Sequence, residues 1–205
     1  MPSMTRNAIV VNLNRCIGCF GCEVACKQEN DVPLGEYWNK VEIIGPLGTF
    51  PKIKQYWLPT MCQQCTNAPC VDVCPTGASK RDEETGLVII DRETCIGCQS
   101  CMSACPYGVR SYNEKAGVVG KCIACNHLVK QGKNPACVDA CCGQARTFGD
   151  LDDPESAAAK AVAAAGADAH QFADSGNGPA TVYILSEKIA PWQEDQPTPF
   201  ADLKF

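Results

Sequence analysis

A repeated cysteine motif decides how this chain folds. It reads CIGCFGCEVAC at residues 16–26 and CIGCQSCMSAC at residues 95–105, so seven of its eleven positions are identical. Two further cysteine groups share a second template, in which CVDVC at 70–74 matches CVDAC at 137–141. The groups alternate along the chain, and this A-B-A-B order indicates an internal duplication.

Cysteine dominates the composition, with 17 of 205 residues, far above the usage of an ordinary intracellular enzyme. Sixteen of these cysteines form four groups of four, which we number one to four along the chain, and Cys142 is left over. The groups are Cys16, Cys19, Cys22 and Cys26; Cys62, Cys65, Cys70 and Cys74; Cys95, Cys98, Cys101 and Cys105; and Cys122, Cys125, Cys137 and Cys141. A disulfide scaffold does not suit an odd number of cysteines in a chain of this length.

Apolar residues make up 45% of the chain, but this figure falls to roughly 37% when the cysteines are left out. We therefore expect a group bound by the thiols to replace part of the hydrophobic core. The net charge of −5 comes without a basic block, which argues against nucleic acid as a partner. No window approaches eighteen consecutive apolar residues, so we expect no membrane span.

Three thiols in a CxxCxxC loop can hold one corner of a 4Fe-4S cubane, and the fourth ligand then comes from elsewhere in the chain. In bacterial ferredoxins the cysteine that precedes a proline binds the other cluster of a pair. Cys74-Pro75 and Cys105-Pro106 both fit that pattern. Structural zinc is the competing interpretation, but a zinc site has no use for a third and a fourth cysteine so close by.

The remaining sequence predicts short elements and loops. Strands are expected at 8–13, 53–58, 87–91 and 181–185. A hairpin with a Thr85-Gly86 turn is expected between Cys74 and Cys95. A helix capped by Asp153 is expected to begin at Pro154 and to end before Gly166. Residues 33–51 are rich in Gly, Pro and aromatic residues and are expected to be irregular, either as a covering flap or as a docking segment. Residues 190–205 are expected to be extended.

The four motifs together resemble one known family, the four-cluster iron–sulfur subunits of molybdopterin oxidoreductases such as dimethyl sulfoxide, polysulfide, tetrathionate and arsenate reductases. The resemblance covers about residues 7–149 and rests on CxxCxxCxxxC at 16–26, CxxCxxxxCxxxCP at 62–75, CxxCxxCxxxCPYG at 95–108, and CxxC with an eleven-residue gap before CxxxC at 122–141. It implies an α+β, cluster-rich fold of two nested ferredoxin-like modules. The inner module would span 59–112, the outer module 7–32 plus 113–149, an insertion 33–58, and a C-terminal helix, strand and tail 150–205.

Position by position, the resemblance implies four 4Fe-4S clusters. Cluster 1 would be held by Cys16, Cys19, Cys22 and Cys141; cluster 2 by Cys62, Cys65, Cys70 and Cys105; cluster 3 by Cys95, Cys98, Cys101 and Cys74; and cluster 4 by Cys122, Cys125, Cys137 and Cys26. The family usually has Pro where Cys142 stands, so Cys142 could compete with Cys141 for cluster 1. The x3 spacing from Cys137 favours Cys141.

Cluster binding would make the chain strongly negative. Sixteen thiolates and four oxidised cores of charge +2 change the net charge to about −13. Basic residues near the ligands could compensate this charge and tune reduction potentials, or could be solvated surface charges. They are Lys27, Lys80, Arg81, Arg110, Lys121 and Arg146. His127 could donate to a cluster sulfur but fits an exposed polar residue better, and Trp38, Trp57 and Trp192 fit packing roles.

The expected function is electron transfer, because no residue set indicates bond-making chemistry. The family implies relay of single electrons to or from a molybdopterin catalytic subunit in anaerobic respiration, with a membrane quinol-oxidising subunit as a further candidate partner. The alternatives are a free-standing polyferredoxin and a zinc-binding scaffold. The N-terminal MPSMTRNAIVV has no secretory pattern, so we expect either co-export with a signal-bearing partner to the extracytoplasmic face, or the cytoplasm.

Overall fold

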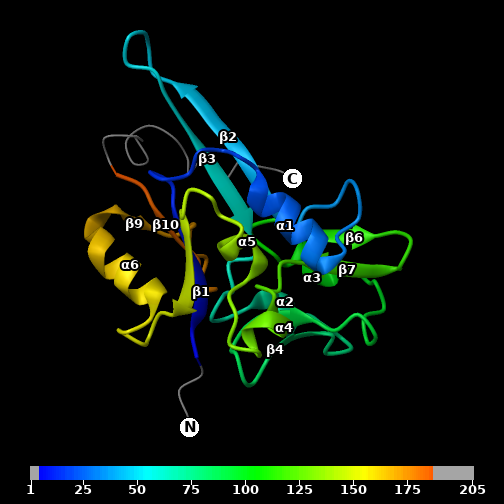
Figure 1. Cartoon of the computed structure of the whole chain (residues 1–205). Helices are drawn as coiled ribbons and strands as arrows, with labels where there is room; N and C mark the ends of the chain where they lie inside the picture. The colour runs from blue at the N-terminus through cyan, green and yellow to red at the C-terminus, as the bar shows by residue number, and fades with distance from the viewer. Residues whose placement is uncertain (1–4, 187–205) are drawn as a thin grey trace.

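Short helices lie within the cysteine groups in the computed structural model, which describes residues 5–186 (Figure 1). These helices are α1 (Gly21–Asn30), α2 (Pro69–Asp72), α3 (Ser100–Ser103), α4 (Asn126–Val129) and α5 (Ala136–Asp139). Helix α1 of group one contacts α5 of group four, and α2 of group two contacts α3 of group three. The chain is therefore α+β, with group one beside group four and group two beside group three, as in two nested ferredoxin-like modules.

Two small hairpins follow the second and third groups. Strands β4 (Ser79–Arg81) and β5 (Val88–Ile90) pair antiparallel, which confirms the predicted hairpin between Cys74 and Cys95. Gly86 in its turn has φ of 68°, and a Cβ there would lie 2.0 Å from the Thr5 carbonyl oxygen, so the turn requires glycine. Strands β6 (Arg110–Asn113) and β7 (Val118–Lys121) form the second hairpin.

A four-stranded sheet joins the two ends of the described chain. Its order is β8 (Arg146–Asp150), β1 (Asn7–Asn12), β10 (Val182–Ile184) and β9 (Ala169–His170). Strand β1 pairs antiparallel with β8 and parallel with β10. The strands predicted near 8–13 and 181–185 are confirmed, and the parallel pair places the C-terminal segment directly beside the first strand.

The prediction of an irregular segment at 33–51 was wrong. Strands β2 (Asn39–Leu47) and β3 (Lys54–Met61) form a long antiparallel hairpin that projects from the rest of the chain (Figure 1). Gly45 and Pro46 lie at a β-bulge between Ile44 and Leu47, and Gly48 and Pro51 lie in the tip, where a hairpin tolerates them, whereas Pro59 lies within β3 opposite Val41. Phe50 in the tip is 85% exposed.

The predicted C-terminal helix exists but begins three residues later than expected. Helix α6 spans Ala157–Ala165, and its cap is Ser156, whose Oγ accepts a hydrogen bond from the Ala159 N–H. Asp153 instead forms a turn before the helix, in which its Oδ1 accepts the Glu155 N–H. A short 3₁₀ helix, Gly166–Asp168, follows. Every helix within residues 5–186 is too short or too polar to span a bilayer. The predicted extended tail at 190–205 lies outside the described residues.

Cysteines form much of the hydrophobic core. The largest buried cluster includes five of them, and a second cluster includes three. A third cluster, made by Val10, Ala158, Val182 and Ile184 between the sheet and α6, contains none. The core is therefore built around thiols everywhere except where α6 covers the sheet.

Candidate metal centres

Three cavities are each lined by four cysteines, and in each cavity three come from one group and the fourth from its paired group. Site 1 is lined by Cys16, Cys19, Cys22 and Cys141. Site 2 is lined by Cys62, Cys65, Cys70 and Cys105, and site 3 by Cys95, Cys98, Cys101 and Cys74. The exchange of the last cysteine between paired groups follows from the contacts of α1 with α5 and of α2 with α3.

The four other patterned cysteines, Cys26, Cys122, Cys125 and Cys137, form site 4 and are all buried. Burial is the main cause that raises the pKa of the Cys26 thiol, and the nearby Cys122, Cys137 and Cys125 raise it further. Helix α1 makes this grouping possible, because Cys22 and Cys26 are four residues apart and lie on one face of the helix. Cys22 lines site 1 while Cys26 lies among the site 4 thiols.

The backbone takes the same unusual conformation in all four motifs. The residue before the second cysteine has positive φ in each: 65° at Gly18, 48° at Gln64, 66° at Gly97 and 49° at Ala124. This conformation curls each loop around its cavity. In group four the backbone N–H of Ala124 donates a hydrogen bond to the sulfur of Cys122, 3.4 Å away. Such bonds stabilise negative charge on sulfur.

Amide donors outside the motifs also reach the sulfurs. Asn177 Nδ2 lies 3.1 Å from Cys65 Sγ, and Asn30 Nδ2 lies 3.6 Å from Cys125 Sγ. Asn177 belongs to the C-terminal segment, where the Gly178 carbonyl accepts the N–H of Thr66. Sequence reasoning missed Asn177, because no pattern links it to a cysteine 112 positions earlier.

Shared elements and the pKa shifts of the thiols favour the order 1, 4, 2, 3 for the four sites, since α1 carries Cys22 of site 1 and Cys26 of site 4, and α2 contacts α3. Burial and Cys137 of the same site raise the pKa of Cys122 to about 12, and Cys62 of site 2 adds to this shift. Cys22 of site 1 similarly contributes to the raised pKa of Cys137 in site 4, which burial dominates. Cys70 of site 2 contributes to that of Cys101 in site 3, where burial again comes first. Exposed cysteines stand at the two ends, namely Cys19 in site 1 and Cys98 in site 3.

The donor sets fit iron–sulfur clusters better than single ions. Across residues 5–186 no group of three or more His, Cys, Asp or Glu side chains is placed to hold one metal ion, whereas tetrahedral zinc needs its sulfurs about 2.3 Å from a common centre. Arg110 Nη1 is buried without a hydrogen-bond partner, and Arg110 lines site 2. A sulfide in that cavity would provide the missing acceptor. The buried thiols likewise need a cationic core to become thiolates.

Comparison with known proteins agrees with this geometry. The family described as "4Fe-4S dicluster domain" matches residues 53–151, and "4Fe-4S binding domain" matches residues 13–33. The chain is 35% identical to the arsenate respiratory reductase iron-sulfur subunit ArrB of Shewanella sp., over 88% of this chain and 97% of that protein. It is 47% identical to the thiosulfate reductase electron transfer subunit PhsB of Salmonella typhi, over 69% and 74%, and 45% identical to protein NrfC of Escherichia coli, over 74% and 68%.

The chain belongs to this family of iron–sulfur subunits of oxidoreductases. The resemblance carried by its cysteine motifs is thereby confirmed. As an iron–sulfur subunit it holds four 4Fe-4S clusters and carries electrons for a catalytic subunit. The two matched segments contain all sixteen patterned cysteines.

The basic residues of this iron–sulfur subunit fall into two sets. Arg110, Lys121 and Arg146 are buried, at 7%, 1% and 4% exposure. Lys27, Lys80 and Arg81 are not, and they bind main-chain carbonyls or a surface carboxylate. Only the first set is therefore enclosed among the cysteine sites.

The other candidate residues have structural roles. His127 is exposed and its Nε2 lies 2.7 Å from Glu29 Oε1, so it contacts a carboxylate and no sulfur among the described residues. Trp38 is buried, and the Trp57 ring packs against Gly18, where a Cβ would lie 2.3 Å from the indole nitrogen. Trp192 lies outside the described residues.

Proposed function

We propose that the chain relays single electrons along the order of sites 1, 4, 2, 3 between a molybdopterin-containing catalytic subunit and a second redox partner. The observation that carries this proposal is the exposure of the cysteines, because sites 1 and 3 each have an exposed cysteine, whereas every cysteine of sites 4 and 2 is buried or half-buried. The pKa shifts of the thiols favour the order that puts sites 4 and 2 in the middle. When bound, each cluster accepts and releases one electron. The protein encloses the middle of the path and leaves its two ends accessible.

The proposed ligand sets are the four cysteines of each site. The cavities support this assignment for clusters 1, 2 and 3, and the mutual effects of Cys26, Cys122, Cys125 and Cys137 support it for cluster 4. Main-chain donors favour thiolates at the exchanged positions as well, because the N–H of Ala145 lies 3.2 Å from Cys141 Sγ and that of Ser79 lies 3.3 Å from Cys74 Sγ.

Contact with a partner at each end is supported by two equivalent apolar residues. Ile17 and Ile96 follow the first cysteine of groups one and three, and they are 61% and 65% exposed. Ile17 lines site 1 and Ile96 lines site 3. A large apolar side chain beside an exposed cysteine suits a surface that another protein covers.

Copurification tests the proposed partner. We expect the affinity-tagged full chain, isolated anaerobically from its natural host, to bring with it a larger polypeptide that contains molybdenum and a pterin. The same preparation is repeated with Ile17→Glu and, separately, with Ile96→Glu. The variant that no longer brings the larger polypeptide with it identifies the end that binds this polypeptide, since a buried charge weakens an interface. A chain that purifies alone and still passes electrons to several soluble enzymes would support the polyferredoxin alternative and contradict the proposal.

Cys142 is expected to be dispensable for cluster binding. It is exposed and its Sγ lies 3.6 Å from Cys19 Sγ, whereas Cys141 lines site 1. Cys142→Ser should therefore retain about sixteen irons per chain, and Cys141→Ser should lose iron from one cluster. Iron and acid-labile sulfide analysis of both variants provides the measurement. The reverse result, with iron lost only in Cys142→Ser, would transfer the ligand role from Cys141 to Cys142.

The compartment stays a prediction. Export in a complex with a signal-bearing partner and residence in the cytoplasm both suit the proposed role, and fractionation of host cells with an antibody against the chain distinguishes them.

A further inference from the structure

One buried arginine follows the later cysteine group of each pair, group three in the pair of groups two and three, and group four in the pair of groups one and four. Arg110 stands five residues after Cys105, and Arg146 stands five residues after Cys141. Each begins a strand directly after its cysteine group, Arg110 in β6 and Arg146 in β8. Their exposed fractions are 7% and 4%. A buried guanidinium is costly unless anions surround it, so both positions need an explanation.

Arg146 lies beside thiols of two neighbouring sites. Its Nη2 lies 3.3 Å from Sγ of Cys22 in site 1. In site 4, burial raises the pKa of Cys137, and the positive charge of Arg146 opposes this rise. Asn39 Oδ1 accepts a hydrogen bond from Arg146 Nη2 at 2.9 Å, which fixes the guanidinium between the two sites. Arg146 therefore lies at the junction of sites 1 and 4.

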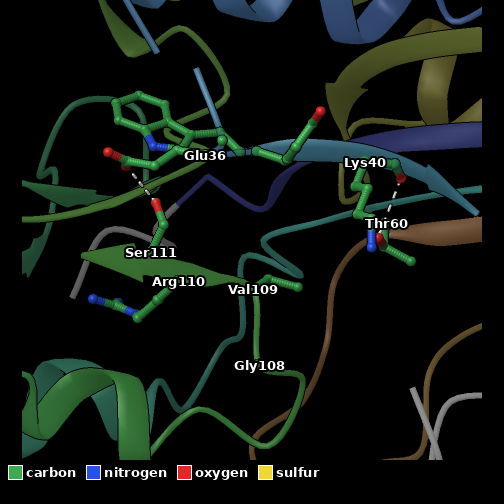
Figure 2. Close-up of a pocket in the computed structure, with 10 residues that line it drawn as sticks. Glu36, Lys40, Thr60, Gly108, Val109, Arg110 and Ser111 are labelled. Atoms are coloured by element: carbon green, nitrogen blue, oxygen red, sulfur yellow. Dashed lines mark hydrogen bonds between the residues drawn. The ribbon is translucent and has the colours of Figure 1, made fainter. Parts of the chain in front are cut away.

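Arg110 has the same relation to sites 2 and 3. It lines the site 2 cavity, and its Nη2 donates a hydrogen bond at 3.0 Å to Oγ of Ser79, which lines the site 3 cavity. Burial raises the pKa of Cys101 in site 3, and the positive charge of Arg110 opposes this rise. Figure 2 shows that the neighbouring Ser111 points toward Glu36 in a surface pocket, while Arg110 points to the other side of the strand. Side chains alternate along β6, so those of Ser111 and Arg110 leave the strand on opposite sides, although Arg110 is also among the residues that line this pocket, which no cysteine lines.

The charge of these arginines faces sulfur. Among the described residues neither Arg110 nor Arg146 forms an ion pair with a carboxylate. The third buried cation, Lys121, differs, because its Nζ donates to the main-chain carbonyls of Val88 and Cys122. The forked guanidinium can reach two sulfurs at once, which an ammonium group cannot do in the same way.

We propose that Arg146 and Arg110 are positioning residues that each bridge two adjacent clusters and raise the reduction potentials of both, Arg146 for clusters 1 and 4 and Arg110 for clusters 2 and 3. This inference rests on the ligand sets proposed above. A positive charge and N–H donors at the ligand sulfurs stabilise the added electron on either cluster. Each pair of neighbouring sites thus has one bridging arginine.

Redox titration of the whole chain, followed by low-temperature EPR, tests the proposal with Arg146→Gln, Arg146→Lys and the matching Arg110 variants. In Arg146→Gln we expect the equilibrium constant for reduction of clusters 1 and 4 to fall at least tenfold, which lowers their reduction potentials by about 59 mV for one electron. The potentials of clusters 2 and 3 should change much less. Arg110→Gln should give the reciprocal pattern. Lysine keeps the positive charge but lacks the forked guanidinium, so it can reach only one of the two sites. In each Lys variant we therefore expect the reduction potential of one cluster of the pair to fall and that of the other to stay near its original value.

Arg81→Gln is the matched control, because Arg81 donates to the main-chain carbonyls of Cys65 and Thr66 and should move no pair of potentials. The proposal is overturned if a Gln variant shifts the reduction potential of one cluster alone or of all four clusters equally. It is also overturned if a Lys variant leaves the potentials of both clusters of its pair unchanged. Should a Gln variant fail to load its clusters, the Lys variant still decides between these results. Iron analysis separates the two levels: fewer than about sixteen irons in the wild type contradicts the ligand sets, whereas a full complement with unmoved potentials contradicts only the bridging role.

Discussion

Replacing Cys70 with Ala is expected to remove one cluster and to interrupt electron flow in the middle of the chain. Cys70 is buried in site 2, and site 2 lies between sites 4 and 3. The other three cysteines of that site cannot complete the coordination of a 4Fe-4S cluster by themselves. Iron should fall from about sixteen to about twelve per chain, and electron transfer between the two partners should fall to background.

Activity measured in two ways locates the break. With the natural electron donor the Cys70→Ala complex should be inactive, while a small dye that reduces the catalytic subunit directly should restore turnover. Cys142→Ala is the matched control, since it removes a thiol that lines none of the three cavities. About twelve irons with unchanged natural activity would show that cluster 2 lies off the path, and about sixteen irons would show that Cys70 is not a ligand.

Removing the iron should unfold most of the chain. Nine cysteines are buried, and the two largest core clusters include eight of them. Without cluster cores these regions would enclose cavities lined by thiols, and the remaining apolar residues are few. A metal core that forms only in the folded state contributes its binding free energy to folding. We therefore expect the cooperative thermal transition to disappear after anaerobic chelation.

Hydrogen exchange should show which part survives. The cluster of Val10, Ala158, Val182 and Ile184 contains no cysteine, so the strands beneath α6 should keep the most protection, and the loops of all four motifs should lose it. Readdition of iron and sulfide should restore both the transition and the protection. An iron-free chain that melts cooperatively near the original temperature would contradict this account of the core.

The cysteine spacing alone predicts much of the metal chemistry. The pattern indicates cubane clusters, because three closely spaced thiols can hold one corner of a cubane, whereas the α+β fold is what the family resemblance implies. The family resemblance adds the exchange of the fourth ligand, and the cavities agree with it. Local signals also locate the strands near 8–13, 53–58, 87–91 and 181–185.

What the sequence does not reveal depends on contacts between distant segments. The β2–β3 hairpin was missed because its glycines and prolines resemble loop residues until the pairing partner is known. Asn177 carries no signal of its contact with Cys65. Six basic residues near ligands look alike in sequence, yet only the packing around Arg110, Lys121 and Arg146 distinguishes buried cations from surface ones.

The parallel pairing of β1 with β10 affects how the molecule is made. Val10 pairs with Val182, so the sheet stays incomplete until almost the whole described chain has left the ribosome. Sites 2 and 3 need only residues 62–105, whereas site 1 needs residues as distant as Cys16 and Cys141. Because short loops close at lower entropic cost, the inner pair of cofactors can be installed on a nascent chain before the outer pair has all of its ligands.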